Sequence, residues 1–376
     1  MGNRPKESLL KIIINQTGQS TKCRGSNSDY RQPNHFLLLA APPSASTLVG
    51  PVPFKDVVGD DDDNGAAPPD EYDDIVSALP TSTTLGLRHY QGAWVSEWRV
   101  RGVISAQRGF APRPGDVLLG SPPKCGTTWL KALSFAVMAR GAYPPAGAGH
   151  PLRRLNPHDC VPFMDELFSA GQQAKLDVLP SPRLMNTHMH HSLLPASVAD
   201  NPDCKIVYVC REPKDMVVSM WHFLRGVWRF TFAELFEWAC EGKTPNGPVW
   251  DHILGYWRAS RAAPERVLFL RYEEMLVDPA GHVRELARFL GRPFSAADEA
   301  AGLPASVVEL CSFGALRGVS ARSAGSCSGS RVEFSHQSYF RKGAVGDWAN
   351  HMTADMARRF DAIVEDKLRG SGLAFD

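Results

Sequence analysis

The 376-residue sequence lacks an excess of either charge, because 41 Lys and Arg residues face 40 Asp and Glu residues and the formal net charge is +1. Binding to nucleic acid or to an anionic membrane surface requires clustered excess positive charge, so this balance argues against both partners. A local basic pocket for one phosphate-bearing ligand remains compatible with it. Long apolar runs are also missing, and no segment approaches the roughly 18 apolar residues of a membrane-spanning helix.

Paired cysteines are missing as well. The eight Cys residues are scattered without a C-x-x-C pair, and no spacing typical of a metal site occurs. The apolar run from Leu9 to Ile14 is interrupted by Lys11 and is too short for a secretory signal peptide. We therefore expect a soluble, cytoplasmic protein with reduced thiols, without a bound metal and without a membrane anchor.

Residues 1–74 differ from the rest of the chain in hydrophobic patterning and net charge. They lack sustained hydrophobic periodicity, include the acidic run Asp60–Asp63 and carry a net charge of −4, which leaves +5 for the remainder. Clustered like charge with little apolar patterning is typical of a disordered segment. We expect a disordered N-terminal extension over 1–74 and one folded domain over 75–376.

In the second region, short apolar runs alternate with helical periodicity. The continuous runs at 116–120, 205–210 and 266–271 predict strands that are buried on both faces, as in a parallel sheet. Helices are expected at 127–140, 215–225, 231–241, 249–261 and 279–290. The alternation predicts a single α/β domain with a central parallel β-sheet flanked by helices.

The run SPPKCGTTW at 121–129 lies between a predicted strand and a predicted helix. At such a position, free backbone N–H groups and the helix dipole favour an anion. Gly126 allows the chain to pass close to a phosphate, and Thr127 and Thr128 supply hydroxyl donors. A helix-capping turn with a surface lysine is the alternative interpretation.

This loop differs from a nucleotide P-loop, which reads G-x-x-x-x-G-K-[ST]. Lys124 precedes the second Gly by two residues, and Thr127 stands at the P-loop Lys position. Arg211 follows the predicted strand at 205–210, where a Walker B acid for Mg²⁺ would be expected. Because a sulfuryl group carries less charge than a terminal phosphoryl group, it can be transferred without a metal.

The loop resembles that of the cytosolic sulfotransferases, which carry Pro-Lys-[Ser/Thr/Cys]-Gly-Thr-Thr-Trp where they bind the 5′-phosphosulfate end of 3′-phosphoadenylyl sulfate (PAPS). Residues 123–129 match this motif, and Tyr90-Gln-Gly92 and Asn186 are similar to the plant members. The resemblance implies the P-loop-like sulfotransferase fold and PAPS as co-substrate. It assigns donor binding to Lys124, Cys125, Gly126, Thr127, Thr128 and Trp129, with a thiol at Cys125 where the family often has the stronger donor Ser.

A second anion site is expected at the end of the strand at 205–210, where open α/β sheets bind ligands. Arg211 offers a bidentate fork to a phosphate, and Ser219 adds a hydroxyl; a charged turn is the alternative. The run 208–219 resembles the family motif whose Arg and Ser bind the 3′-phosphate. The resemblance adds Arg341, Lys342 and Gly343 to that phosphate site and places Tyr272 at the adenine.

His188 is the candidate base. A neutral imidazole suits proton removal from a hydroxyl near pH 7, whereas no carboxylate or Cys completes a metal set with His188 and His190. The family's base lies in a Thr-His pair ahead of Leu-Pro, which Thr187-His188 and Leu194-Pro195 match. The resemblance implies that His188 deprotonates the acceptor while Lys124 stabilises the leaving group.

The implied reaction is sulfuryl transfer from PAPS to a hydroxyl of a small organic acceptor such as a flavonoid or steroid, giving adenosine 3′,5′-bisphosphate (PAP) and a sulfate ester. Six aromatic residues could line the acceptor pocket or belong to the core: Trp94, Phe163, Phe168, Trp221, Phe223 and Trp228. Thr353 fits the family's short dimer motif but Ala349, Ala354 and Arg358 do not, so we expect a monomer, with a weak dimer as the alternative. A P-loop kinase or NTPase and an inactive nucleotide-binding sensor remain the alternatives.

Overall fold

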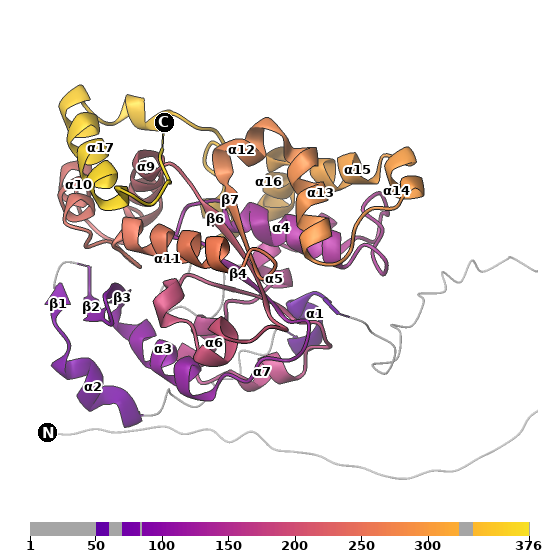
Figure 1. Cartoon of the computed structure of the whole chain (residues 1–376), viewed down its shortest axis with the longest axis horizontal. Coiled ribbons are helices and arrows are strands. Elements are labelled where there is room, and N and C mark those ends of the chain that lie inside the picture. Colours follow the sequence, from indigo (N-terminus) through magenta and orange to yellow (C-terminus); the bar gives the residue numbers. More distant parts are fainter. Residues whose placement is uncertain (1–49, 60–69, 83–84, 323–333, 376) are drawn as a thin grey trace, which may run out of the picture. The chain divides into compact units, whose positions relative to one another are not determined.

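A four-stranded parallel sheet lies at the centre of the fold (Figure 1). Its strands follow the order β5 (Leu184–Thr187), β4 (Val117–Gly120), β6 (Lys205–Cys210) and β7 (Val267–Arg271). The computed structural model describes residues 50–59, 70–82, 85–322 and 334–375, all within one compact unit. The predicted α/β fold with a central parallel sheet is confirmed, and the three expected strands are β4, β6 and β7.

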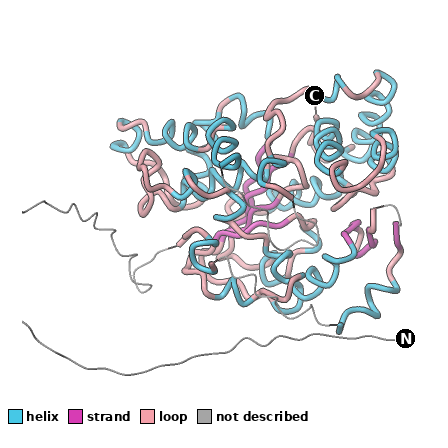
Figure 2. The backbone as a smooth tube through the Cα atoms, turned by 180° about the vertical axis from the view of Figure 1, so that it is seen from behind, coloured by secondary structure: helices cyan, strands magenta, loops and turns pink. Residues whose placement is uncertain are grey.

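Helices cover both faces of this sheet, so its strands lie inside a shell of helices (Figure 2). In β6, Ile206 and Tyr208 face one apolar cluster and Val207 and Val209 face the other, which explains why the run is continuously apolar. One cluster includes side chains of α3 (Glu97–Gly109), α6 (Met164–Ser169), α9 (Pro213–Leu224), α10 (Phe232–Cys240), α11 (Val249–Ala262) and α17 (Ala354–Leu368). The other includes α4 (Thr127–Met138), α12 (Tyr272–Val277), α13 (Pro279–Phe289), α15 (Leu303–Leu310) and α16 (Phe313–Arg322).

The remaining helices are short. They are α1 (Phe54–Val58), α2 (Asp73–Ala78), α5 (Pro157–Cys160), α7 (Ala174–Asp177), α8 (Ala196–Ala199) and α14 (Ala296–Ala300). Among the described residues, no helix combines the length and the apolar character needed to cross a bilayer.

A second, antiparallel sheet was not predicted from the sequence. It consists of β1 (Thr81–Ser82), β2 (Leu87–Tyr90) and β3 (Ala93–Ser96). Gln91 and Gly92 connect β2 and β3 with φ values of 47° and 88°, as a tight hairpin of two residues with positive φ requires. Backbone hydrogen bonds of Trp94 with Gly247 (2.7 Å) and Asn246 (2.8 Å) attach this sheet to the segment before α11.

Part of the region before the expected domain boundary at residue 75 is folded. Val52 is 6% exposed and belongs to the core, Gly50 donates a backbone hydrogen bond to Ser181 (3.2 Å), and α1 follows directly. Asp56 of α1 forms an ion pair with Arg154. Residues 50–59 and 70–74 are therefore folded, whereas 1–49 and 60–69 of the predicted disordered extension lie outside the described residues.

A buried ion pair joins the starts of β4 and β5. Asp116 and Arg183 are 3% and 1% exposed, and Asp116 accepts hydrogen bonds from the Arg183 guanidinium at 2.6–3.2 Å and from its backbone N–H at 3.0 Å. Asp116 also accepts a bond from the backbone N–H of Arg113 (2.8 Å). The pair is therefore fully hydrogen-bonded, which a buried charge requires.

We predict that Asp116→Ala destabilises the fold by about 3–5 kcal/mol, because it removes the buried counter-charge of the Arg183 guanidinium and leaves only the exposed Asp177 carboxylate, 3.7 Å away. The double variant Asp116→Ala/Arg183→Leu should regain a large part of this loss, since it removes the isolated charge. Urea unfolding followed by circular dichroism measures both. Equal instability of the single and double variants would contradict the prediction.

Candidate active site

The loop between β4 and α4 has a backbone shape that favours glycine at its end. Gly126 precedes α4 with φ 99°, and a Cβ there would lie 2.8 Å from the Tyr272 ring. Lys124 also has positive φ (68°), which turns the chain sharply just before the helix. The first N–H groups of α4 therefore border the loop without intrahelical acceptors, as an anion site needs.

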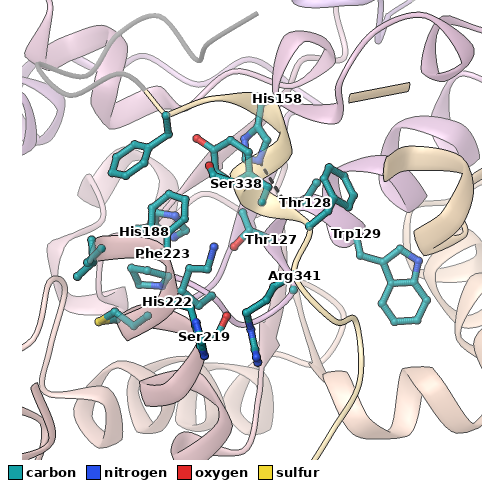
Figure 3. A pocket seen from close by; sticks show the side chains of 18 of the residues that line it. Thr127, Thr128, Trp129, His158, His188, Ser219, His222, Phe223, Ser338 and Arg341 are labelled. Atoms are coloured by element: carbon teal, nitrogen blue, oxygen red, sulfur yellow. Dashed lines mark hydrogen bonds between the residues drawn. The ribbon is translucent and has the colours of Figure 1, made fainter. Parts of the chain in front are cut away.

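A cavity of about 530 Å³ opens beside this loop, at the ends of β4 and β6 (Figure 3). It brings together the candidate site residues of the sequence analysis with one exception. Those that line it are Lys124, Gly126, Thr127, Thr128, Trp129, His188, Arg211, Ser219, Tyr272, Arg341, Lys342 and Gly343. Three motifs that are far apart in the sequence thus meet in one place.

Cys125 is the exception. Its side chain is completely buried and packs in the apolar core, and burial strongly raises the pKa of the thiol. The Cys125 side chain is not part of the cavity lining, so the ligand contact expected of this residue is left to its backbone. Replacing Ser by Cys at this position therefore costs the site no side-chain donor.

Lys124 lies between cations and aromatic rings. Its Nζ atom is 3.7 Å from the centre of the Phe223 ring and 5.6 Å from that of Tyr339. Burial, together with the nearby charges of Arg211 and Arg341, lowers the pKa of Lys124 to about 7. An anion bound here would reverse this effect, since it favours the charged ammonium.

His188 has a fixed orientation. Its Nδ1 atom lies 2.7 Å from the carbonyl oxygen of Ser121, which can only accept, so Nδ1 carries the proton and Nε2 is left with a free lone pair. Phe163 packs against the ring at 4.9 Å. Burial, followed by the charge of Arg99, lowers the pKa of His188 to about 3, so the ring is neutral at physiological pH.

Asp215 connects the β6–α9 turn to the segment at 341–348. It is fully buried and accepts hydrogen bonds from the backbone N–H groups of Gly346 (2.7 Å) and Trp348 (2.9 Å) and from Arg211 (3.2 Å). Arg211 also donates to the carbonyl of Ala344 (2.7 Å). One carboxylate therefore fixes both the arginine and the segment that carries the second pair of cations.

Asp347 pairs with those cations. It accepts hydrogen bonds from Arg341, Lys342 and Asn350, which outweigh burial and keep the pKa of its carboxyl well below the ordinary value. Within the described ranges, His222, Asp347 and His351 are close enough to bind a metal. The two cations already paired with Asp347 disfavour a divalent ion there.

Some cavity residues were not predicted. Arg99 of α3 and Glu166 of α6 form an ion pair beside the cavity, and Asp165 is 3.5 Å from the same guanidinium. His158 of α5 also lines it. Their segments carry no local motif; the packing of α3 and α6 brings Arg99 and Glu166 to the site, and the packing of α5 against α4 brings His158.

The six candidate aromatic residues divide into two groups. Phe163, Phe223 and Trp228 line the cavity. Phe168 is buried in the core, Trp94 packs against His89, and Trp221 packs against Phe232 and the cavity residue His222; none of these three lines the cavity itself. His190 is buried too, and its Nε2 atom bonds the carbonyl of Asn246 (3.0 Å).

Comparison with known proteins identifies the protein family in which this cavity occurs. The model of the sulfotransferase domain family matches residues 114–372, which is more than half of the chain. Cytosolic sulfotransferase 1 of Arabidopsis thaliana is 42% identical over 313 residues, covering 80% of this chain and 93% of the relative. The chain belongs to the sulfotransferase family.

Other relatives agree. The flavonol 3-sulfotransferase of Flaveria bidentis is 38% identical over 316 residues, with 80% of this chain and 99% of the relative covered. The crystal structure of an Arabidopsis thaliana putative steroid sulphotransferase superposes with a TM-score of 0.66 at 36% identity, covering 81% of this chain and 94% of that one. A mouse sulfotransferase complexed with PAP gives a TM-score of 0.58 at 28% identity, covering 76% and 95%. The protein is therefore a PAPS-dependent sulfotransferase, and the kinase alternative is excluded.

We predict that Asp215→Asn in this sulfotransferase increases the exchange rates of the Gly346 and Trp348 amide hydrogens by about tenfold, because a neutral amide accepts weaker hydrogen bonds than a carboxylate. Hydrogen exchange followed by mass spectrometry on the segment at 341–352 measures the effect. Asp355→Asn, an exposed change on α17, is the matched control. Unchanged exchange in Asp215→Asn would show that the carboxylate does not fix this segment.

Proposed function

We propose that this sulfotransferase transfers the sulfuryl group of PAPS to a hydroxyl of a small, largely apolar molecule, giving PAP and a sulfate ester. The observation that carries the proposal is the orientation of His188, whose unprotonated Nε2 belongs to the cavity that Lys124 also lines. A base and a cation are then present in the same cavity, as transfer to a hydroxyl requires.

PAPS fits the positive charges of the cavity and its unpaired hydrogen-bond donors. The Nε atoms of Arg211 and Arg341 are buried and have no hydrogen-bond partner among the described residues, although both side chains line the cavity. A phosphate group supplies the acceptors that these atoms lack. We assign the 3′-phosphate to Arg211, Ser219, Arg341, Lys342 and the backbone of Gly343.

The 5′-phosphosulfate end belongs to the loop between β4 and α4. Lys124, the hydroxyls of Thr127 and Thr128 and the backbone of Gly126 and Trp129 surround that part of the cavity. Tyr272 lies against Gly126 and is 4.9 Å from the Arg211 guanidinium, a position suited to an adenine ring. Cys125 contributes its backbone alone.

The transfer step uses two groups of the protein. Nε2 of His188 accepts the proton of the acceptor hydroxyl, and the acceptor oxygen forms a bond to sulfur while the bond from sulfur to the bridging phosphate oxygen breaks. Lys124 and the N–H groups at the start of α4 stabilise the negative charge that develops on that phosphate oxygen. Positioning and electrostatics thus account for the catalysis, and we assign no role to a metal.

The acceptor part of the cavity is largely aromatic. Phe163, Phe223 and Trp228 supply flat apolar walls, and Arg99 and Glu166 supply a polar end. A ring compound with one reactive hydroxyl and a further polar group matches this lining. Flavonoids and steroids, which appear in the names of relatives, have this chemistry.

The cellular setting follows the relatives. Several are named cytosolic sulfotransferases, so we propose a cytosolic enzyme that acts as a monomer on free small molecules and not on nucleic acid. The residues that the structure describes between 50 and 375 belong to one compact unit, which we assign as the sulfotransferase domain.

The full chain incubated with PAPS carrying labelled sulfate and a panel of hydroxylated aromatic and alicyclic compounds tests the proposal. Label should move to at least one apolar acceptor and not to simple sugars. PAP binding, measured by titration calorimetry, is the parallel readout. PAP binding without transfer to any acceptor would favour a nucleotide-binding sensor.

His188→Ala should lower transfer by at least about 10²-fold, because it removes the imidazole to which we assign the general base, while PAP binding changes little. Single-turnover transfer and calorimetric PAP titration separate these two effects. His282→Ala, on α13 outside the cavity, is the control. Normal turnover of His188→Ala would remove His188 as the base.

Lys124 makes PAP binding depend on pH. With a pKa of about 7 in the free enzyme, Lys124 is mostly neutral at pH 8, and the bound anion favours its ammonium form. Binding at pH 8 should take up roughly one proton, and affinity should fall as pH rises above about 7. Calorimetry in two buffers of different ionisation enthalpy measures the uptake, which should disappear in Lys124→Met. Wild-type binding without proton uptake would contradict the assignment.

A further inference from the structure

Three side chains beneath the phosphate loop form a connected chain of hydrogen bonds. The Thr128 hydroxyl lies 3.0 Å from Nε2 of His158, a contact drawn in Figure 3, and Nδ1 of the same ring lies 3.1 Å from Nζ of Lys131. Thr128 and His158 line the cavity, whereas Lys131 does not and is completely buried. The chain therefore runs from the protein interior to the donor site.

The chemistry of the three groups fixes the direction of each hydrogen bond. An ammonium group can only donate, so Lys131 donates to Nδ1 of His158, and the proton of the neutral ring is on Nε2. Nε2 then donates to the Thr128 oxygen, and this leaves the hydroxyl hydrogen of Thr128 available for another acceptor. Burial and the charge of Lys131 keep the pKa of His158 well below its ordinary value, consistent with a neutral ring.

The surroundings keep Lys131 and His158 in place. Lys131 lies one helical turn after Thr128 on α4, donates to the carbonyl of Val161 (2.9 Å) and lies 3.5 Å above the Phe163 ring. The His158 ring stacks on the same Phe163 ring, with ring centroids 5.5 Å apart, and its centroid lies 4.3 Å from that of Tyr339. These contacts hold both the His158 ring and the Lys131 ammonium group in the positions that their mutual hydrogen bond requires.

We propose that Lys131, acting through His158, is a positioning residue that turns the Thr128 hydroxyl into a dedicated hydrogen-bond donor to the 5′-phosphate of the nucleotide. Without Lys131, the imidazole can carry its proton on Nδ1 and accept from Thr128, which directs the hydroxyl hydrogen away from the ligand. This inference rests on the proposed function, because it requires a phosphate at the loop.

A double-mutant cycle on the full-length protein tests the series of hydrogen bonds from Lys131 through His158 to Thr128. Thr128→Val and Lys131→Met should each weaken PAP binding by about tenfold, the effect of one hydrogen bond to a charged group. In the Thr128→Val background, Lys131→Met should have no further effect, because the hydroxyl it orients is gone. Thr128→Ser should restore the dependence on Lys131.

Two further measurements separate positioning from damage to the fold. Adenosine 3′-monophosphate lacks the 5′-phosphate, so its affinity should be unchanged in all variants, whereas a distorted site would lose it too. If Lys131→Met does not fold, His158→Phe replaces it in the cycle, since it breaks the chain of contacts and leaves Lys131 with Val161 and Phe163.

The outcomes are distinct. Wild-type protein that does not bind PAP would overturn the proposed function itself. If the wild-type protein binds PAP and Lys131→Met binds it with the same affinity, the positioning role alone is overturned. The same holds for His158→Phe where it replaces Lys131→Met. An additive loss in the Thr128→Val background would also overturn it, because the lysine would then act on the ligand independently of the hydroxyl.

Discussion

The register of the parallel sheet determines the chemistry of this sulfotransferase. Gly120 of β4 pairs with Thr187 of β5, so the residues that follow them, Ser121 and His188, leave the sheet side by side. The Ser121 carbonyl can therefore fix the His188 ring. A shift of one residue in this pairing would turn alternate side chains to the other face and separate the base from the loop.

Electrostatic balance is the second constraint on the cavity. Lys124, Arg211, Arg341 and Lys342 gather within it, and the two buried carboxylates of Asp215 and Asp347 offset part of their repulsion. The compensation is incomplete, because the pKa of Lys124 remains well below its usual range. A near-neutral chain thus contains a cavity that is locally strongly positive, which matches a small polyanionic ligand.

Local patterns were sufficient to predict much of this arrangement. Continuous apolar runs identified β4, β6 and β7, motifs at strand ends identified the residues around Lys124 and Arg211, and the resemblance to the family added those around Arg341. Contacts of long range were beyond such reasoning. The bond from Gly346 to Asp215 spans 131 positions, and neither residue carries a local signal for it. The same is true of Arg99 and His158, which reach the cavity through tertiary packing, and of the burial of the Cys125 thiol in the core.

The inward position of Cys125 separates the phosphate loop from thiol chemistry. The thiolate is the form that oxidants and alkylating agents attack, and here it is disfavoured by burial as well as shielded from solvent. A cysteine in an anion-binding loop next to several cations would ordinarily be a redox-sensitive position. In this sulfotransferase it behaves as a small apolar core residue, so the Cys125 thiol itself is protected from these reagents.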